Sequence, residues 1–316
     1  MINERILAGL RAFQPEDLRR VLNFVGTCCT ITDFCGCFHP GDISHFLSNR
    51  LRGQNLSQHL FFTQDTNGQV NALIMIHPAR FSSFDLMVHP NQRGGEFESQ
   101  LIAWAEKAVL ALLRAESPTA GSEPLSLSTE VMTCDLARVS ALERRGYQPD
   151  AQHSMMVTIR SLTEFIPEPF LPEGFTIRPA AGEHEASLLA DVHSGAFNSN
   201  WTPEEYLKVM RSPGFDIERE WVVVAPDGRF AAFTIIWFDP ISRSGLFEPV
   251  GCHPDFQRLG LARALMYDAM HEMRAQGMTT AVVLHHTDNP ASTGLYASVG
   301  FTPKYAITTY KKTFQA

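Results

Sequence analysis

The hydrophobic pattern of the second half of the chain switches between two periods. Short apolar runs bounded by turn residues predict strands, and apolar residues three or four positions apart predict helices. Strands are predicted at Phe175–Pro179, Trp221–Val224, Arg229–Phe238, Ser244–Cys252, Thr280–Leu284 and Ile307–Lys311. Helices are predicted over 183–196 and 203–211, from Leu261 to the capping residue Gly277, and at Ala291–Val299. This mixture of strands and helices predicts an α/β fold.

The first half repeats this order of elements. Its predicted strands are Leu10–Phe13, His59–Gln64, Val70–His77, Phe84–Val88 and Leu125–Thr129, and its predicted helices are Pro15–Phe24, Phe97–Arg114 and Leu136–Arg145. Each half has a strand that ends in His-Pro, at His89 and His253, and a later Gly-aromatic pair, at Gly146 and Gly300. The His-to-Gly spacing is 57 residues in the first half and 47 in the second, which is too long for a solenoid repeat.

A proline-rich stretch, Ile166–Pro172, separates the two halves and favours an extended connector. A chain of 316 residues is also too long for one ordinary core. We therefore expect two tandem copies of one α/β domain, residues 1–165 and residues 166–316.

Composition narrows the class of protein. Hydrophobic residues make up 44% of the chain and charged residues 19%, which is typical of a globular protein. The net charge of −8 argues against a general binder of nucleic acid or of anionic membranes, because phosphate neutralisation needs Lys and Arg. No apolar run reaches the length of a membrane span, and Met1–Arg5 does not begin a signal peptide. We expect a cytoplasmic protein.

Six cysteines raise the question of metal binding. Four of them are clustered with a histidine, at Cys28, Cys29, Cys35, Cys37 and His39. Structural zinc sites usually show paired C-x-x-C spacings, which are absent here. Cysteines of a chain without an export signal are expected to stay reduced. We favour free, partly buried thiols over a zinc site, and we expect no metal.

The turn after strand Ser244–Cys252 predicts an anion site. Residues Gln257–Ala262 lead into a helix, where unpaired backbone N–H groups and the positive end of the helix dipole favour a pyrophosphate. Gly260 has no Cβ to obstruct a phosphate, and Ala262 is small for the same purpose. The turn therefore points to a nucleotide-type cofactor.

This segment resembles the GCN5-related N-acetyltransferase (GNAT) family. The family signature is Gln/Arg-x-x-Gly-x-Gly/Ala after a strand, followed by an Asn, a Tyr and a Gly-Phe pair. The matching residues are, in order, Gln257, Gly260, Ala262, Asn289, Tyr296, Gly300 and Phe301. The resemblance covers residues 174–312, and the two like halves suggest the mycothiol-synthase-like layout of tandem-domain acetyltransferases. It implies a GNAT fold in each half, with a mixed, mostly antiparallel sheet flanked by helices.

The resemblance also implies acetyl-CoA as cosubstrate and places it. Strands Ser244–Cys252 and Thr280–Leu284 would splay apart, and the thioester arm would lie in the gap. The residues expected to bind it are Val250, Gly251 and Cys252 for the arm, Gln257, Arg258, Leu259, Gly260, Leu261, Ala262 and Arg263 for the pyrophosphate, and Asn289 near the sulphur.

Two residues are expected to carry the proton transfers. Glu248 lies in an apolar run beside the cofactor, where burial would raise its pKa and suit it to act as a base. A Glu that binds a backbone amide or a substrate cation remains an equal alternative, and His285 or His286 could relay the proton instead. Tyr296 would protonate the departing thiolate. A nucleophilic Cys252 is disfavoured because no histidine is arranged with it.

The first half is expected to be degenerate. Alignment of the two His-Pro pairs puts Glu96 at the position of Gly260 and Glu98 at that of Ala262, so carboxylates would repel a pyrophosphate. Alignment of the Gly-aromatic pairs puts Asp135 at Asn289 and Leu142 at Tyr296, and leucine cannot donate a proton. The alternative is that this half binds CoA through backbone contacts alone.

We therefore expect an acetyl-CoA-dependent N-acetyltransferase that acts on a small-molecule amine by direct transfer in the C-terminal domain. The alternative is a non-catalytic CoA- or acyl-CoA-binding sensor or scaffold. The identity of the amine is left open, although an acidic chain favours a cationic one. We expect a monomer, because two like domains in one chain can pair internally.

Overall fold

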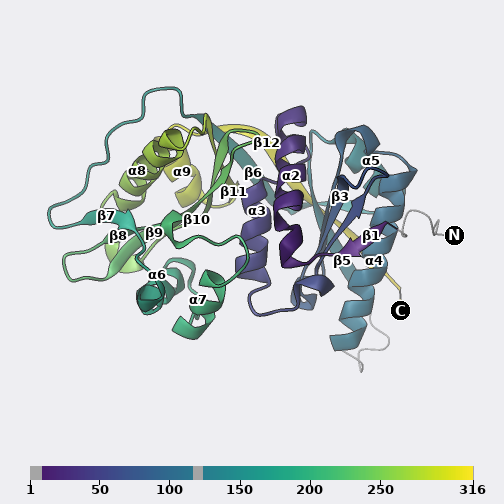
Figure 1. The fold of residues 1–316 in the computed structure, drawn as a ribbon, viewed down its shortest axis with the longest axis horizontal. Helices are drawn as coiled ribbons and strands as arrows, with labels where there is room; N and C mark the ends of the chain where they lie inside the picture. The colour runs from purple at the N-terminus through teal and green to yellow at the C-terminus, as the bar shows by residue number, and fades with distance from the viewer. Residues whose placement is uncertain (1–8, 117–123, 316) are drawn as a thin grey trace. The chain divides into compact units, whose positions relative to one another are not determined.

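The computed structural model describes residues 9–116 and 124–315, and this part of the chain forms two compact units (Figure 1). Unit 1 takes its described residues from the ranges Met1–Phe38, Gln54–Met155 and Tyr305–Ala316, and unit 2 from His39–Gly53 and Met156–Lys304. Met1–Arg5, on which the expectation of no signal peptide rests, lie outside the described residues. In the two described ranges, no helix combines the length and the apolar character needed to cross a membrane.

The boundaries of the two units differ from those of the predicted domains, residues 1–165 and 166–316. The main boundary between the units falls between Met155 and Met156, inside strand β6 (Gln148–Ser161), rather than at the proline-rich stretch. The early segment His39–Gly53 belongs to unit 2, and the last segment, Tyr305–Ala316, belongs to unit 1. A hydrophobic pattern shows that a strand exists but not which strands it pairs with, so these exchanges were not predicted.

Unit 1 contains a four-stranded antiparallel sheet in the order β1-β2-β3-β4, and strand β5 pairs antiparallel with β12. The strands are β1 (Leu10–Ala12), β2 (Leu60–Gln64), β3 (Val70–Ile76), β4 (Phe84–Val88), β5 (Leu125–Met132) and β12 (Thr302–Phe314). The helices are α2 (Leu18–Thr32), α4 (Glu96–Glu116) and α5 (Leu136–Arg144). Buried residues of β3, β4, β5, α4 and α5 form one hydrophobic core.

Unit 2 holds strands in the order β7-β8-β9-β10-β11-β6. All pairs from β7 to β10 are antiparallel, and β10 and β11 are parallel. The new strands are β7 (Thr176–Pro179), β8 (Glu220–Val224), β9 (Phe230–Asp239), β10 (Ser244–Cys252) and β11 (Thr280–His286). The helices are α3 (Pro40–His45), α6 (Ala186–Phe197), α7 (Pro203–Met210), α8 (Leu261–Ala275) and α9 (Pro290–Ser298).

Helices cover both faces of the unit 2 sheet. Helices α8 and α9 lie on one face, and α6 and α7 lie on the other (Figure 1). Alternating residues of β9 supply the two cores, as Ala232 packs toward α8 and Phe233 packs toward α6. The predicted mixed, mostly antiparallel sheets flanked by helices are confirmed.

The structure corrects the expectation that all six cysteines are free. Cys35 and Cys134 form a disulfide in unit 1, with their Cα atoms 6.1 Å apart. These residues are 99 positions apart in the chain, so no local pattern pairs them. Cys28, Cys29 and Cys37 are buried thiols in unit 1. Within the described ranges, no group of three or more His, Cys, Asp or Glu residues is placed to hold a metal ion.

Candidate active site

The predicted gap between two strands is present in unit 2. Strands β10 and β11 pair from Ser244 opposite Thr280 to Phe247 opposite Val283, and the pairing ends there. The register between β10 and its other neighbour, β9, shifts between Phe247 and Val250. Beyond this irregularity, Val250, Gly251 and Cys252 pair only with β9 among the described strands, which leaves their other edge for an extended ligand.

The predicted anion turn follows directly from β10. After the short helix Pro254–Phe256, Arg258 and Gly260 both have left-handed backbones, with φ of 65° and 78°, and α8 begins at Leu261. No side chain caps the start of α8. The backbone amides from Arg258 to Arg263 donate to no acceptor among the described residues. They therefore offer a set of unpaired donors at the positive end of a helix of 15 residues.

The matching turn in unit 1 is closed by the protein itself. Gly94 also has a left-handed backbone, with φ of 72°, but its amide donates to the carboxylate of Glu98. Glu98 is fully buried and forms an ion pair with Arg138, which also donates to the carbonyl of Leu86. An internal carboxylate thus occupies the position where an anionic ligand would be bound.

This arrangement refines the expectation for the first half. Of the two predicted carboxylates, Glu98 accepts the hydrogen bond from the Gly94 amide, whereas Glu96, the first residue of α4, is exposed and accepts a hydrogen bond from Gln100. Glu98 thus fills the turn as a carboxylate that is paired with Arg138. The second alignment also has a structural basis, because Asp135 and Asn289 both cap the start of a helix. Leu142, aligned with Tyr296, is part of the unit 1 core.

Asn289 is held at the end of the gap by the helix it begins. Its side-chain oxygen accepts hydrogen bonds from the amides of Ala291 and Ser292, at 3.1 Å and 3.2 Å. The oxygen is therefore engaged, and the side-chain NH2 group is the part that can donate to a ligand.

Tyr296 lies on α9 with 7% of its surface exposed. Its ring contacts His285 and Phe301, with centroids 5.4 Å and 6.1 Å away. Burial raises the pKa of Tyr296 above its usual value, and the nearby charge of Glu248 acts in the same direction. The hydroxyl therefore keeps its proton at neutral pH, as a proton donor must.

Glu248 is the first residue of β10 beyond its pairing with β11. Its backbone carbonyl accepts a hydrogen bond from Trp237 Nε1 at 2.7 Å. Its side chain is 30% exposed, and burial, followed by the charge of Asp42, raises its pKa to about 8, while Arg50 acts in the opposite direction. A carboxyl with such a pKa can exchange a proton near neutral pH.

Three ionisable groups near Glu248 come from the N-terminal part of the chain, which the sequence analysis did not assign to this site. Asp42, His45 and Arg50 lie on the segment His39–Gly53, which includes α3 and the π-helical turn η2 (Phe46–Arg50). Nε2 of His45 is 3.6 Å from Oε1 of Glu248. The local signal for this helix is present at the sequence level: His39-Pro40-Gly41-Asp42 has a capping side chain, a proline at the first helical position and a capping box.

Buried contacts attach this segment to unit 2. His39 Nδ1 accepts a hydrogen bond from the Gly41 amide at 2.9 Å, so Nε2 carries the proton and donates to Ser244 Oγ at 3.0 Å. Gly41 allows close packing, because a Cβ there would lie 2.4 Å from Cβ of Trp237. His39, which the sequence offered as a possible zinc ligand, is therefore a structural anchor.

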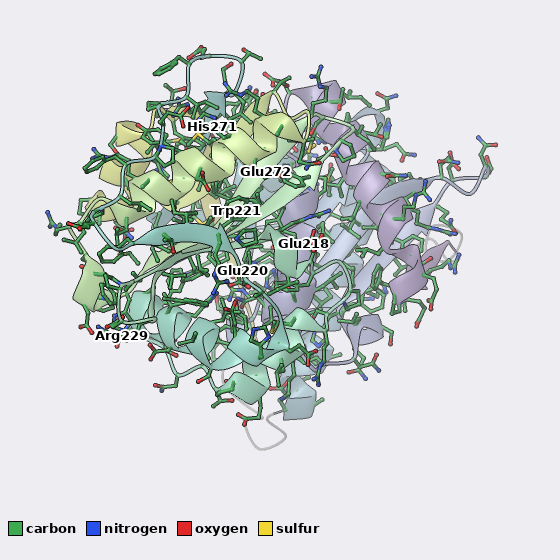
Figure 2. All side chains as sticks on the ribbon, turned by 60° about the vertical axis from the view of Figure 1, so that its left-hand side comes forward. Glu218, Glu220, Trp221, Arg229, His271 and Glu272 are labelled. Carbon is green, nitrogen blue, oxygen red and sulfur yellow. A yellow bond between two sulfur atoms is a disulfide. The ribbon has the colours of Figure 1, made fainter. Side chains whose placement is uncertain are left out.

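A second buried cluster was also missed. Tyr206 and His193 both contact Oε1 of the fully buried Glu220, and the His193 ring stacks on Phe233 with centroids 3.6 Å apart. Figure 2 labels Glu220 and its neighbour Trp221 on β8, between α8 and the helices α6 and α7. The three polar residues are 13 and 14 positions apart in sequence, so helical or strand periodicity does not connect them.

Three further residues that the sequence analysis considered are Cys252, His285 and His286. Burial raises the pKa of Cys252 to about 11, so its thiol stays protonated, which disfavours a cysteine nucleophile. His285 Nδ1 is 3.1 Å from the carbonyl of His286, and His286 itself is exposed. Both histidines are the last residues of β11, which extends two residues beyond the predicted strand Thr280–Leu284.

Comparisons with known proteins agree with this geometry. Residues 187–301 match the acetyltransferase (GNAT) family. A mycothiol acetyltransferase of Streptomyces bingchenggensis is 27% identical over 263 residues, which cover 80% of this chain and 81% of that protein. A mycothiol acetyltransferase of Streptomyces scabiei is 34% identical over 152 residues, which cover 45% of this chain and 48% of that protein.

Solved structures support the same fold. A GCN5-related N-acetyltransferase from Sphaerobacter thermophilus has a TM-score of 0.66 at 19% identity, covering 97% of this chain and 96% of its own. A tandem GNAT protein from the clavulanic acid biosynthesis pathway has a TM-score of 0.62 at 13% identity, covering 96% of this chain and 98% of its own. The chain therefore has a tandem GNAT fold with a mycothiol-synthase-like layout, and the matches over its C-terminal half support an enzyme that acts as an N-acetyltransferase.

Proposed function

We propose that this protein transfers the acetyl group of acetyl-CoA to a small-molecule amine, and that the reaction takes place in unit 2. The observation that carries this proposal is the gap between β10 and β11, which opens beside both Glu248 and the uncapped turn before α8. A cofactor with a phosphate at one end and an extended arm at the other suits this arrangement.

The binding roles follow from the unpaired groups. Amides from Arg258 to Arg263 take the pyrophosphate, with Arg258 or Arg263 adding positive charge, whereas the Gln257 amide already donates to the carbonyl of Pro254. The free edge of Val250–Cys252 accepts the arm as an additional strand, and the NH2 group of Asn289 donates a hydrogen bond near the sulphur.

The chemistry is a direct transfer. The amine nitrogen attacks the thioester carbonyl carbon, a C–N bond forms and the C–S bond breaks. The carboxylate of Glu248 accepts the proton that the amine loses, and Tyr296 gives its hydroxyl proton to the departing thiolate. Because the pKa of Glu248 is about 8, its basic form becomes abundant only as the pH rises through that value.

The relatives suggest the class of acceptor. Several proteins similar to this chain are mycothiol acetyltransferases, so we propose that the acceptor is an amine related to mycothiol.

The test is consumption of acetyl-CoA with a panel of amines: deacetylated mycothiol, glucosamine, an aminoglycoside, spermidine and an amino acid. We expect free thiol to appear with at least one amine, and Glu248→Gln to lower the rate by at least about tenfold at unchanged acetyl-CoA affinity. Binding of acetyl-CoA without any thiol release would favour the sensor alternative. An unchanged rate in the variant would remove Glu248 as the base.

Cofactor stoichiometry tests the assignment to one unit. Because Glu98 and Arg138 close the turn in unit 1, we expect calorimetry to show one acetyl-CoA per chain. Two equivalent sites per chain would contradict the proposed role of Glu98.

A further inference from the structure

The residues around Glu248 include a histidine from the N-terminal part of the chain. The inference below rests on the proposed role of Glu248 as the base. His45 is the last residue of α3, and its side chain is 17% exposed. Its Nε2 atom points at the Glu248 carboxyl, with 3.6 Å between Nε2 and Oε1.

The position of His45 is set by firm contacts on either side of it. Before His45 in the sequence, His39 donates a hydrogen bond to the hydroxyl of Ser244. That hydroxyl lies 2.6 Å from the hydroxyl of Ser242, which in turn donates a hydrogen bond to Asp239. After it, the guanidinium of Arg52 lies 4.1 Å from the centre of the Trp201 ring. These contacts attach both ends of the segment His39–Gly53 to the rest of unit 2, so α3 holds the imidazole of His45 in place.

We propose that His45 is a positioning residue for the base Glu248. The imidazole N–H donates to one carboxylate oxygen and leaves the other oxygen directed at the acceptor amine. The present separation is longer than a hydrogen bond, and we expect it to shorten when an acceptor amine orders the carboxylate.

His45 does not carry the proton itself. Burial, followed by the charges of Arg50 and His193, lowers the pKa of His45 to about 3, so the imidazole is neutral throughout the working range. The proton taken from the amine therefore ends on Glu248, whose partial exposure allows it to leave for solvent after the reaction.

The charged and titratable groups that face this pair come from four elements. Asp42 on α3 raises the pKa of Glu248, and Arg50 on η2 lowers it. His193 on α6 affects His45, and Tyr296 on α9 is affected by Glu248. A neutral imidazole N–H adds to these a donor that favours the ionised carboxylate. Its removal should therefore shift the ionisation of Glu248 to higher pH.

The experiment compares pH profiles of kcat/KM for acetyl-CoA and the best amine of the panel. In the wild type, activity should rise with pH through about 8, the pKa of Glu248. In His45→Phe we expect this midpoint to rise by about half to one pH unit, and the rate at pH 7 to fall by about threefold to tenfold. His45→Gln keeps an N–H donor at similar reach and should return the midpoint toward the wild-type value.

His184→Phe is the matched control, because His184 is an exposed histidine on the short helix Glu183–Glu185. Its midpoint should equal that of the wild type. Acetyl-CoA affinity, measured by calorimetry, checks that each variant keeps a folded cofactor site. A lower rate in His45→Phe with an unmoved midpoint, unrepaired by His45→Gln, would mean that His45 only packs, and would overturn the proposal. Failure of the wild type to consume acetyl-CoA with any amine would instead reject the proposed function.

Discussion

Three side chains near the gap have their protonation set by burial, which raises the pKa of each one. The pKa of Glu248 rises to about 8, the pKa of Cys252 rises to about 11, and that of Tyr296 also rises. Glu248 can therefore lose its proton near neutral pH, whereas Cys252 and Tyr296 keep theirs. At the scale of the residue, the same desolvation produces a base, an inert thiol and a proton donor.

Tyr296 offers a direct test of this division. We expect Tyr296→Phe to lower turnover at least about tenfold, equivalent to about 1.4 kcal/mol, because only the proton for the thiolate is lost. Acetyl-CoA affinity should remain nearly unchanged, as measured by calorimetry. Tyr267→Phe is the control, since its hydroxyl makes only a 3.4 Å contact with the carbonyl of Ser298. Equal turnover in wild type and Tyr296→Phe at saturating substrate would refute the assignment.

At the scale of the element, the two units differ most at the start of one helix. Helix α8 begins with unpaired amides and no capping side chain, whereas the turn before α4 donates to the buried Glu98. Gly94 and Arg258 occupy matching left-handed positions after the short helix, but Gly260, the second left-handed residue of the α8 turn, has no left-handed counterpart, because α4 already begins at Glu96. We expect the buried ion pair between Glu98 and Arg138 to place an internal carboxylate where unit 2 would bind an external anion.

A charge placed in the α8 turn should reproduce the closed state of unit 1. We expect Gly260→Glu to abolish measurable acetyl-CoA binding, because its carboxylate would compete for the free amides and repel a pyrophosphate. Gly277→Glu is the matched control: Gly277 is also left-handed, with φ of 85°, and lies at the other end of the same helix. Calorimetry should show near-normal affinity for this control. Wild-type affinity in Gly260→Glu would count against the phosphate site.

At the scale of the whole molecule, local signals predicted most elements but not the assembly of the units. Ser244–Cys252 and Phe84–Val88 are strands with the predicted bounds, because their apolar runs end at turn residues. The capping box at His39 predicts the start of a helix, but not the sheet on which that helix packs. The partner of Glu248, the Cys35–Cys134 bond and the exchange of segments between units all depend on residues far apart in sequence. A single amino-acid sequence gives no signal for such distant pairs.

The disulfide makes a prediction about unit 1 as a whole. It closes a loop of 99 residues, and we expect Cys134→Ser to lower the stability of unit 1 by about 4–5 kcal/mol on the chain-entropy estimate. Hydrogen exchange at the amides of β5 and α5 would measure the change within unit 1. A reducing agent should have the same effect on the wild type and no further effect on the variant. Identical protection in both proteins would show that the bond does not form in solution.

The transfer of His39–Gly53 into unit 2 bears on how such a chain can evolve after duplication of an ancestral gene. Recombination at the proline-rich stretch would yield a C-terminal product that retains Glu248 but lacks His45 and its anchor His39. Such a protein would keep the turn before α8 but would lack the histidine beside Glu248. Selection for acetylation would then preserve the N-terminal copy for the segment that it contributes to unit 2.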